Sequence, residues 1–75
     1  QRAEMTDTVS RIRSLMKTLP DQQRLVMQLR DIEGMTYDEI AKAVNIPMNQ
    51  VKVNLFRARK KIREALINTD QYGLQ

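Results

Sequence analysis

The chain contains no cysteine, no histidine and no tryptophan among its 75 residues. The absence of cysteine and histidine excludes disulfide scaffolds, thiol nucleophiles, zinc sites built from these residues and acid–base catalysis by imidazole. Only two glycines and two prolines are present, which argues against a turn-rich all-β fold. No apolar run approaches the roughly 20 residues that a bilayer-spanning helix needs. These absences favour a helical domain without a membrane segment.

The residues that remain give little support to catalysis. Ser10 and Ser14 are the only serines, and the chain contains neither a G-x-S-x-G motif nor a glycine-rich phosphate loop. The carboxylates do not cluster with any nucleophile. We therefore expect a protein that is not an enzyme and that carries neither a cofactor nor a metal ion.

Positive charge is concentrated in the second half of the chain. Residues 1–41 hold six basic and seven acidic residues, whereas residues 42–75 hold seven basic and two acidic ones, for net charges of −1 and +5. No acidic residue occurs between Lys42 and Arg63. Charge of one sign in one segment indicates a polyanionic partner. Because the chain begins with Gln1 rather than methionine and shows no signal peptide, we expect a piece of a longer cytoplasmic protein.

Apolar residues at helical spacing predict four helices and no strand, at about residues 6–18, 20–32, 36–44 and 47–68. Thr6 or Asp7 can cap the first helix, and Pro20 separates it from the second. Gly34 fits the left-handed position after the second helix, and Asn45 fits the same position after the third. The first two helices are expected to bury Val9, Ile12, Leu15, Met16 and Leu19, and Leu25, Val26, Leu29 and Ile32, respectively.

The start of the third helix carries the clearest local signal. Thr36 and Glu39 have the T-x-x-E spacing of a capping box, in which each side chain accepts a hydrogen bond from the other residue's backbone N–H. Met35 and Ile40 have the spacing of a hydrophobic staple. This segment is therefore predicted to begin a helix at Thr36.

The fourth helix is predicted to have two faces of different chemistry. At about 100° per residue, the core stripe consists of Val51, Leu55, Ala58 and Ile62. The opposite face consists of Asn49, Lys52, Val53, Phe56, Arg57, Lys60 and Arg63. Like charges three and four residues apart destabilise a helix, and a merely solvated face has no use for valine and phenylalanine. Such a face suits the major groove, where apolar side chains contact thymine methyls.

A short capped helix, a three-residue turn and a second helix follow the helix-turn-helix plan. In that plan the second helix enters the major groove, and the first crosses the DNA backbone. We therefore expect an all-α, four-helix helix-turn-helix DNA-binding domain, similar to a winged helix without its wing. Its expected parts are a lead-in and first helix at 1–18, a core at 19–68 and a frayed tail at 69–75.

Two stretches of sequence resemble region 4, the C-terminal promoter-recognition domain, of bacterial sigma factors of the extracytoplasmic-function group. The stretches read L-P-x-x-Q-R-x-V-x-x-L-R-D-x-E-G-M-T-Y-D-E-I-A and N-I-P-M-N-Q-V-K-V-N-L-F-R-A-R-K-K-I-R-E-A-L, and together they span Leu19 to Leu66. The resemblance implies binding to double-stranded promoter DNA at the −35 element. It also implies a place on the flap of the β subunit of RNA polymerase core, and often an anti-sigma factor that masks the domain.

The resemblance also implies which residues meet DNA. The residues implied at base edges are Asn49, Lys52, Val53, Phe56 and Arg57, to which Gln50 is added because glutamine pairs with adenine. The residues expected at phosphates are Arg30, Tyr37, Lys42 and Arg59, with the basic Lys60 and Arg63 further along the same helix. The chain departs from the family at Pro47, where serine or threonine is usual, and at Asn45, where glycine is common.

Several of these residues have a structural alternative. Tyr37 can pack on the second helix, and Phe56 can lie between helices rather than face DNA. Lys42 can be an ordinary solvated lysine. Arg30 can pair with the neighbouring Asp31 or Glu33.

Two alternative functions remain for the domain as a whole. The effector domains of response regulators share the four-helix plan but usually lack the R-A-R-K-K-I-R segment. A protein-interaction module could instead dock its basic helix on an acidic partner, with some of the five methionines forming an adaptable apolar surface. Binding to a membrane surface is disfavoured, because the apolar face of the fourth helix is needed for the core.

Overall fold

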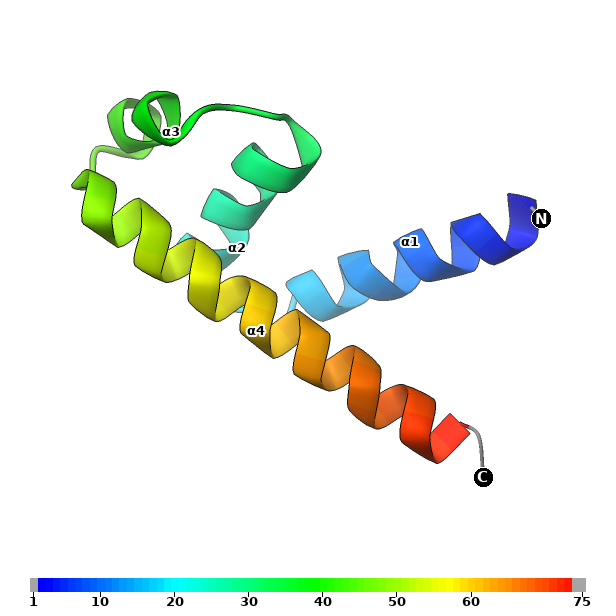
Figure 1. The fold of residues 1–75 in the computed structure, drawn as a ribbon. Helices are drawn as coiled ribbons and strands as arrows, with labels where there is room; N and C mark the ends of the chain where they lie inside the picture. The colour runs from blue at the N-terminus through cyan, green and yellow to red at the C-terminus, as the bar shows by residue number, and fades with distance from the viewer. Residues whose placement is uncertain (1, 74–75) are drawn as a thin grey trace.

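The computed structural model describes the backbone of residues 2–73 and the side chains of residues 7–68. The elements are α1 (Arg2–Met16), α2 (Asp21–Met27), a π-helical turn η1 (Gln28–Ile32), α3 (Tyr37–Val44) and α4 (Met48–Gly73). Over the described residues the chain is all-α, as predicted. The long helix α4 forms one side of the molecule, with α3 at its first turns and α2 near its middle (Figure 1). The start of α1 and the end of α4 both lie away from α3 (Figure 1).

The two outer helix boundaries differ from the prediction. The first helix begins at Arg2, so Thr6 and Asp7 lie within it and do not cap it. The last helix continues to Gly73, beyond the predicted end near Asn68, so most of the expected frayed tail is helical. Residues 74–75 of that tail lie outside the described residues. Both extensions have the same reason, which is that neither segment contains a proline or an internal glycine that would stop the helix.

The second predicted helix is divided into α2 and η1. The Glu33 N–H donates to the Gln28 carbonyl over 3.1 Å, which is an i to i+5 bond, and the Met35 N–H reaches back to the Leu29 carbonyl over 3.0 Å. The predicted stripe is wrong in part, because Val26 is buried and Leu29 half-buried, but Leu25 and Ile32 are exposed. The wider turns rotate Ile32 away from the core, whereas Leu25 lies in α2, before these turns begin. In α1, Val9 is also exposed rather than buried.

Two left-handed residues end helices as predicted. Gly34 has φ 74° and follows Glu33, the C-cap of η1, whereas Asn45 has φ 62° and ψ 50° directly after α3. A β-carbon at Gly34 would meet no atom within 4 Å. The glycine is therefore required by its backbone angle and not by a lack of space.

The core lies where α1, α2 and α3 meet the inner face of α4. Its buried apolar members are Met16, Leu19, Val26, Met27, Ile40, Val51, Leu55, Ala58 and Ile62. The four members from α4 are those of the predicted core stripe, so the inner face of this helix is confirmed. A further contact joins α2 to α4 at the surface, where the Asn54 amide donates to the Gln22 side-chain oxygen over 3.0 Å.

Candidate nucleic-acid interface

The geometry of α3 is set by its capping box. The Glu39 N–H donates to the Thr36 hydroxyl oxygen over 3.1 Å, and the Thr36 N–H donates to the Glu39 carboxylate over 2.8 Å. Ile40, the staple residue, is completely buried. The predicted start of this helix is therefore confirmed, and it fixes the helix that precedes the turn.

A tight turn sets the direction of α4. The Ile46 N–H donates to the Ala41 carbonyl over 3.1 Å, and the half-buried Ile46 packs against the core. The Pro47 carbonyl then accepts from the N–H groups of Gln50 and Val51, at 3.0 and 3.1 Å. Proline at this position therefore leaves the first backbone bonds of α4 in place, although its ring offers no side-chain cap.

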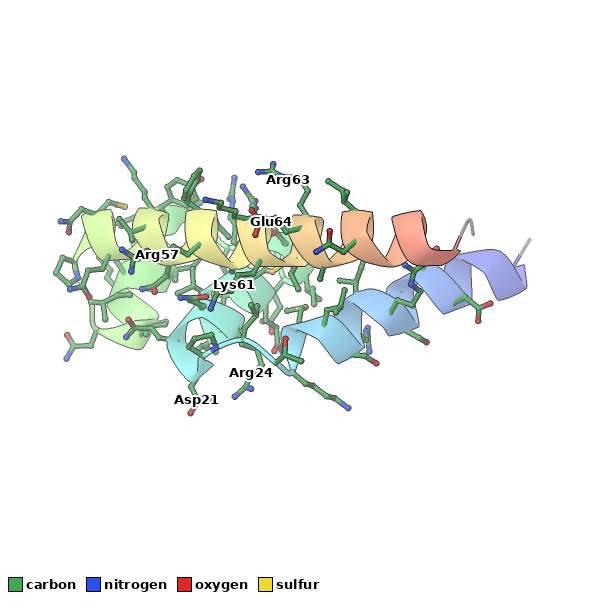
Figure 2. The ribbon with its side chains drawn as sticks, turned by 90° about the horizontal axis from the view of Figure 1, so that it is seen from below. Asp21, Arg24, Arg57, Lys61, Arg63 and Glu64 are labelled. Atoms are coloured by element: carbon green, nitrogen blue, oxygen red, sulfur yellow. The ribbon has the colours of Figure 1, made fainter. Side chains whose placement is uncertain are left out.

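The outer face of α4 is open to solvent, as predicted. Val53 is 43% exposed and Phe56 is 65% exposed, so Phe56 does not lie between helices. The polar and basic members of the face are likewise exposed, namely Asn49, Gln50, Lys52, Arg57, Lys60 and Arg63. Figure 2 shows Arg57, Lys61 and Arg63 along α4, with Arg63 on the edge of the helix that faces away from α1 and α2.

Two acids on the elements beside α4 are already paired. Asp38 lies 3.1 Å from the Lys42 ammonium one turn along α3. Asp31 pairs with Arg59 through two hydrogen bonds. Among residues 7–68, whose side chains are described, Lys52, Arg57, Lys60 and Arg63 form no ion pair with an acid. This face therefore presents several cations that no carboxylate of the described region neutralises.

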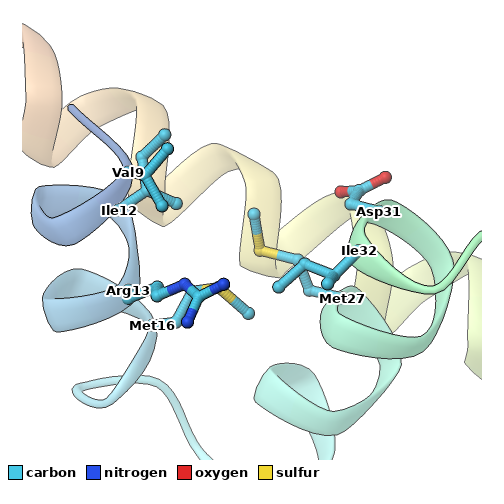
Figure 3. Close-up of a pocket in the computed structure, with 7 residues that line it drawn as sticks. All are labelled: Val9, Ile12, Arg13, Met16, Met27, Asp31 and Ile32. Atoms are coloured by element: carbon cyan, nitrogen blue, oxygen red, sulfur yellow. The ribbon is translucent and has the colours of Figure 1, made fainter. Parts of the chain in front are cut away.

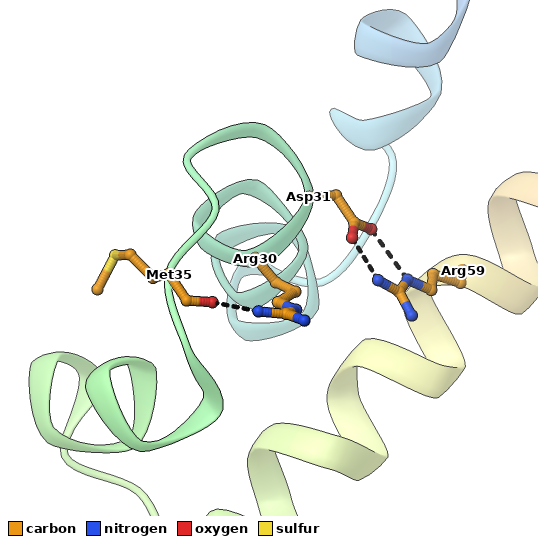
Figure 4. A network of polar contacts seen from close by, with 4 residues as sticks. All are labelled: Arg30, Asp31, Met35 and Arg59. Carbon is orange, nitrogen blue, oxygen red and sulfur yellow. Dashed lines mark hydrogen bonds and ion pairs between the residues drawn. The ribbon is translucent and has the colours of Figure 1, made fainter.

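Two arginines expected at phosphates have structural partners (Figure 4). Arg30 donates from Nη1 to the Met35 carbonyl over 2.8 Å, and its guanidinium lies 5.0 Å from the centre of the Tyr37 ring. Its partners are thus a carbonyl and a ring, and not Asp31 or Glu33. The Arg59 guanidinium contacts Asp31, and these hydrogen bonds raise the pKa of Arg59 above its ordinary value.

A groove of about 350 Å³ collects part of the predicted site along one flank of α4. It is lined by Tyr37, Lys52, Leu55, Phe56, Arg59, Lys60 and Arg63. The remaining predicted residues lie outside this groove, namely Arg30, Lys42, Asn49, Gln50, Val53 and Arg57. The predicted site is therefore divided between this grooved flank, other exposed side chains of α4, and Lys42 of α3 and Arg30 of η1.

Sequence reasoning missed a second groove, between α1 and the α2–η1 segment. It has a volume of about 300 Å³ and is lined by Val9, Ile12, Arg13, Met16, Met27, Asp31 and Ile32. Side chains from the two segments face each other across it, with Val9 and Ile12 on one side and Met27 and Ile32 on the other (Figure 3). The apolar spacing gave the signal, but spacing alone does not separate a core residue from one that lines an open groove.

Within the described part of the chain, no group of three acidic, histidine or cysteine residues is placed to hold a metal ion. The same region contains no helix with the length and apolarity needed to cross a membrane.

Two helices joined by a tight turn, the second with a solvent-facing basic side, define a helix-turn-helix DNA-binding domain. The family model described as sigma-70, region 4 matches residues 10–62, which is more than half of the chain. The chain therefore belongs to the sigma-70 region 4 family.

Curated relatives agree with this assignment. The chain is 33% identical over 67 residues to an RNA polymerase sigma-H factor of Pseudomonas aeruginosa, covering 88% of this chain and 35% of the relative. It is 36% identical over 47 residues to ECF RNA polymerase sigma-E factors of Escherichia coli and Salmonella typhi, covering 63% of this chain and 25% of each relative. The chain thus spans about a third or less of the relatives it matches.

Proposed function

We propose that this domain binds the −35 promoter element in double-stranded DNA as part of a sigma factor, and so directs transcription initiation in the cytoplasm without catalysis. The observation that carries the proposal is the outer face of α4. Here the exposed Val53 and Phe56 share the face with four cations that form no ion pair within residues 7–68, namely Lys52, Arg57, Lys60 and Arg63. A helix with this face, held behind a helix-turn-helix turn, suits the major groove. The similarity of the chain to sigma factors supports promoter DNA as the target.

The proposed contacts follow the exposure of the side chains. Residues at the first turns of α4 and on its outer face read base edges, namely Asn49, Gln50, Lys52, Val53, Phe56 and Arg57. Lys42, Lys60 and Arg63 are proposed at phosphates, since each carries an exposed cation. Arg30 and Tyr37 are proposed to contact the phosphates of the DNA backbone together, because the Arg30 guanidinium is stacked over the Tyr37 ring.

The salt dependence of binding tests this function. Duplexes selected by the chain from a randomised pool are compared with scrambled duplexes by fluorescence anisotropy. Contact with about four phosphates predicts a slope of log affinity against log salt near −3.6, or about a hundredfold loss over a fourfold rise in salt. The selected duplex should remain bound at salt concentrations that release the scrambled one. Equal affinity for both duplexes at every salt concentration would favour the acidic-partner alternative.

We further propose that the apolar groove between α1 and η1 receives the β-subunit flap of RNA polymerase core. Its lining consists mainly of aliphatic and methionine side chains, and Ile32 is 53% exposed. Exposed apolar surface of this kind marks interaction sites, and methionine adapts to different partners.

Replacing Ile32 with aspartate should weaken binding to RNA polymerase core about tenfold or more, because a buried isoleucine contributes about 1.5–3 kcal/mol and a buried carboxylate adds a desolvation cost. Leu25→Asp is the matched control, since Leu25 is exposed on α2 outside the groove. Both affinities can be measured by biolayer interferometry with immobilised core enzyme. Equal losses for the two variants would argue against this groove as the docking site.

A further inference from the structure

The contact between Arg59 and Asp31 joins α4 to η1, and the two residues are 28 positions apart in the chain. Arg59 Nε donates to Asp31 Oδ2 over 2.9 Å, and Arg59 Nη2 donates to Asp31 Oδ1. Figure 4 shows the guanidinium of α4 facing the carboxylate of η1 edge on. This two-bond geometry is the strongest arrangement between these groups, and it fixes the plane of the guanidinium.

Pairing with Asp31 reduces both the net charge and the number of free N–H donors with which Arg59 can bind a polyanion. The charge of Asp31 offsets that of Arg59, and two of the five guanidinium N–H groups are directed at the carboxylate. The Asp31 side chain is only 29% exposed. If Arg59 moved to a phosphate, it would leave a partly buried carboxylate without its partner and close to the DNA backbone.

The position of Arg59 makes this neutralisation relevant to binding. Arg59 lines the same groove as Lys52, Phe56, Lys60 and Arg63, on the flank of α4 that is proposed to face DNA. A free arginine there would reach phosphates on any sequence, because phosphates carry no sequence information. The paired arginine adds little to such contacts.

We propose that Asp31 is a positioning residue that holds Arg59 away from the DNA backbone and thereby limits the sequence-independent affinity of the domain. This inference rests on the proposed DNA-binding function. A complex with the preferred duplex is fixed in register by base contacts. A complex with a random duplex depends on phosphate contacts alone, so a released Arg59 strengthens it more.

The test compares salt slopes for the chain and its variants on selected and scrambled duplexes. Asp31→Asn keeps the shape of the side chain but removes its charge. It should steepen the slope on scrambled duplex by about 0.9 and raise the affinity about eightfold at 0.1 M salt, as one extra phosphate contact does. The gain on the selected duplex should be smaller. Arg59→Gln should not reduce the slope by the roughly 0.9 that loss of a phosphate contact costs, although it lowers the affinity by leaving Asp31 unpaired near the DNA. The double variant removes both charges and should return the slope of the unaltered chain.

Two further variants separate positioning from charge alone. Asp31→Glu keeps the carboxylate and should restore the original slope. Glu33→Gln removes an exposed acid two residues along the chain and should leave the slope unchanged.

The proposal is overturned if Asp31→Asn leaves the slope unchanged, if Glu33→Gln steepens it equally, or if Arg59→Gln alone reduces it by about 0.9, as loss of an existing phosphate contact would. If Asp31→Asn does not fold, as judged by circular dichroism, the Arg59→Gln slope decides by the same criterion. Failure of the unaltered chain to bind duplexes with a salt-dependent affinity overturns the proposed function and this inference together. Normal binding by the unaltered chain with any of the three contrary results overturns the inference alone.

Discussion

Alanine at Lys52 or at Arg57 is expected to weaken binding to the preferred duplex by about 1–3 kcal/mol, or about 5- to 150-fold, for each residue that contacts a base edge in two-bond geometry. Both side chains are exposed on α4, and neither is paired with an acid among the described residues. Their loss should therefore cost little folding stability. The affinity for the selected duplex should fall more than that for the scrambled duplex, so the ratio of the two affinities also falls.

Two matched variants on the same helix make this result specific. Lys60→Ala should weaken both duplexes alike and reduce the salt slope by about 0.9, because a phosphate contact carries no sequence information. Lys61→Ala removes the same charge from a lysine outside the proposed site and should change binding little. Equal losses on selected and scrambled duplexes for Lys52→Ala and Arg57→Ala would contradict base reading by these residues.

Local signals in the sequence predicted the parts of the fold that matter for α4. The capping box at Thr36 and Glu39 and the left-handed Asn45 each depend on residues within four positions of one another, so they can be recognised without the tertiary structure. The core stripe of α4 was equally clear, because the helix is long and its two faces differ strongly in chemistry. Together these signals place the outer face of α4 in solvent.

The division of the second helix could not be predicted in this way. The sequence of residues 28–32 contains no pattern that distinguishes a π-helical turn from an α-helix. The π-helical turn η1 lies just before the left-handed Gly34. Its consequences are large, since it leaves Ile32 on the surface and places Asp31 against Arg59. The apolar groove and the Arg59 pair are therefore properties of packing between distant segments.

The candidate site shows the same division. Exposure of Val53 and Phe56 followed from their angular position on one helix. The partners of Arg30 and Arg59 did not, because each lies on another element or on a turn. Sequence reasoning assigned both arginines to phosphates by position, whereas the structure gives each an intramolecular contact that DNA would have to replace or accommodate.

Replacing Ile40 with alanine is expected to lower the free energy of unfolding by about 2–5 kcal/mol, the range for deleting a buried aliphatic side chain. Ile40 is completely buried in α3, in the core that also contains Val51 of α4. A domain of 75 residues has a total stability of about 4–11 kcal/mol, so this one change removes a large part of it. Urea unfolding followed by circular dichroism measures the loss. Ile32→Ala is the matched control, because the same change at an exposed isoleucine should cost within about 0.5 kcal/mol.

The Ile40→Ala variant also separates the contribution of the core to folding stability from the contribution of the outer face of α4 to DNA binding. Because Ile40 lies on the inner side of the helix-turn-helix, its loss should reduce the folded fraction without changing the outer face of α4. The affinity per folded molecule should therefore stay close to that of the unaltered chain, with the same salt slope and the same preference between duplexes. Lys52→Ala should show the opposite pattern, with full stability and a lost preference. If Ile40→Ala lost sequence preference while still fully folded, the core contact between α3 and α4 would be setting the angle of the recognition helix as well as its stability.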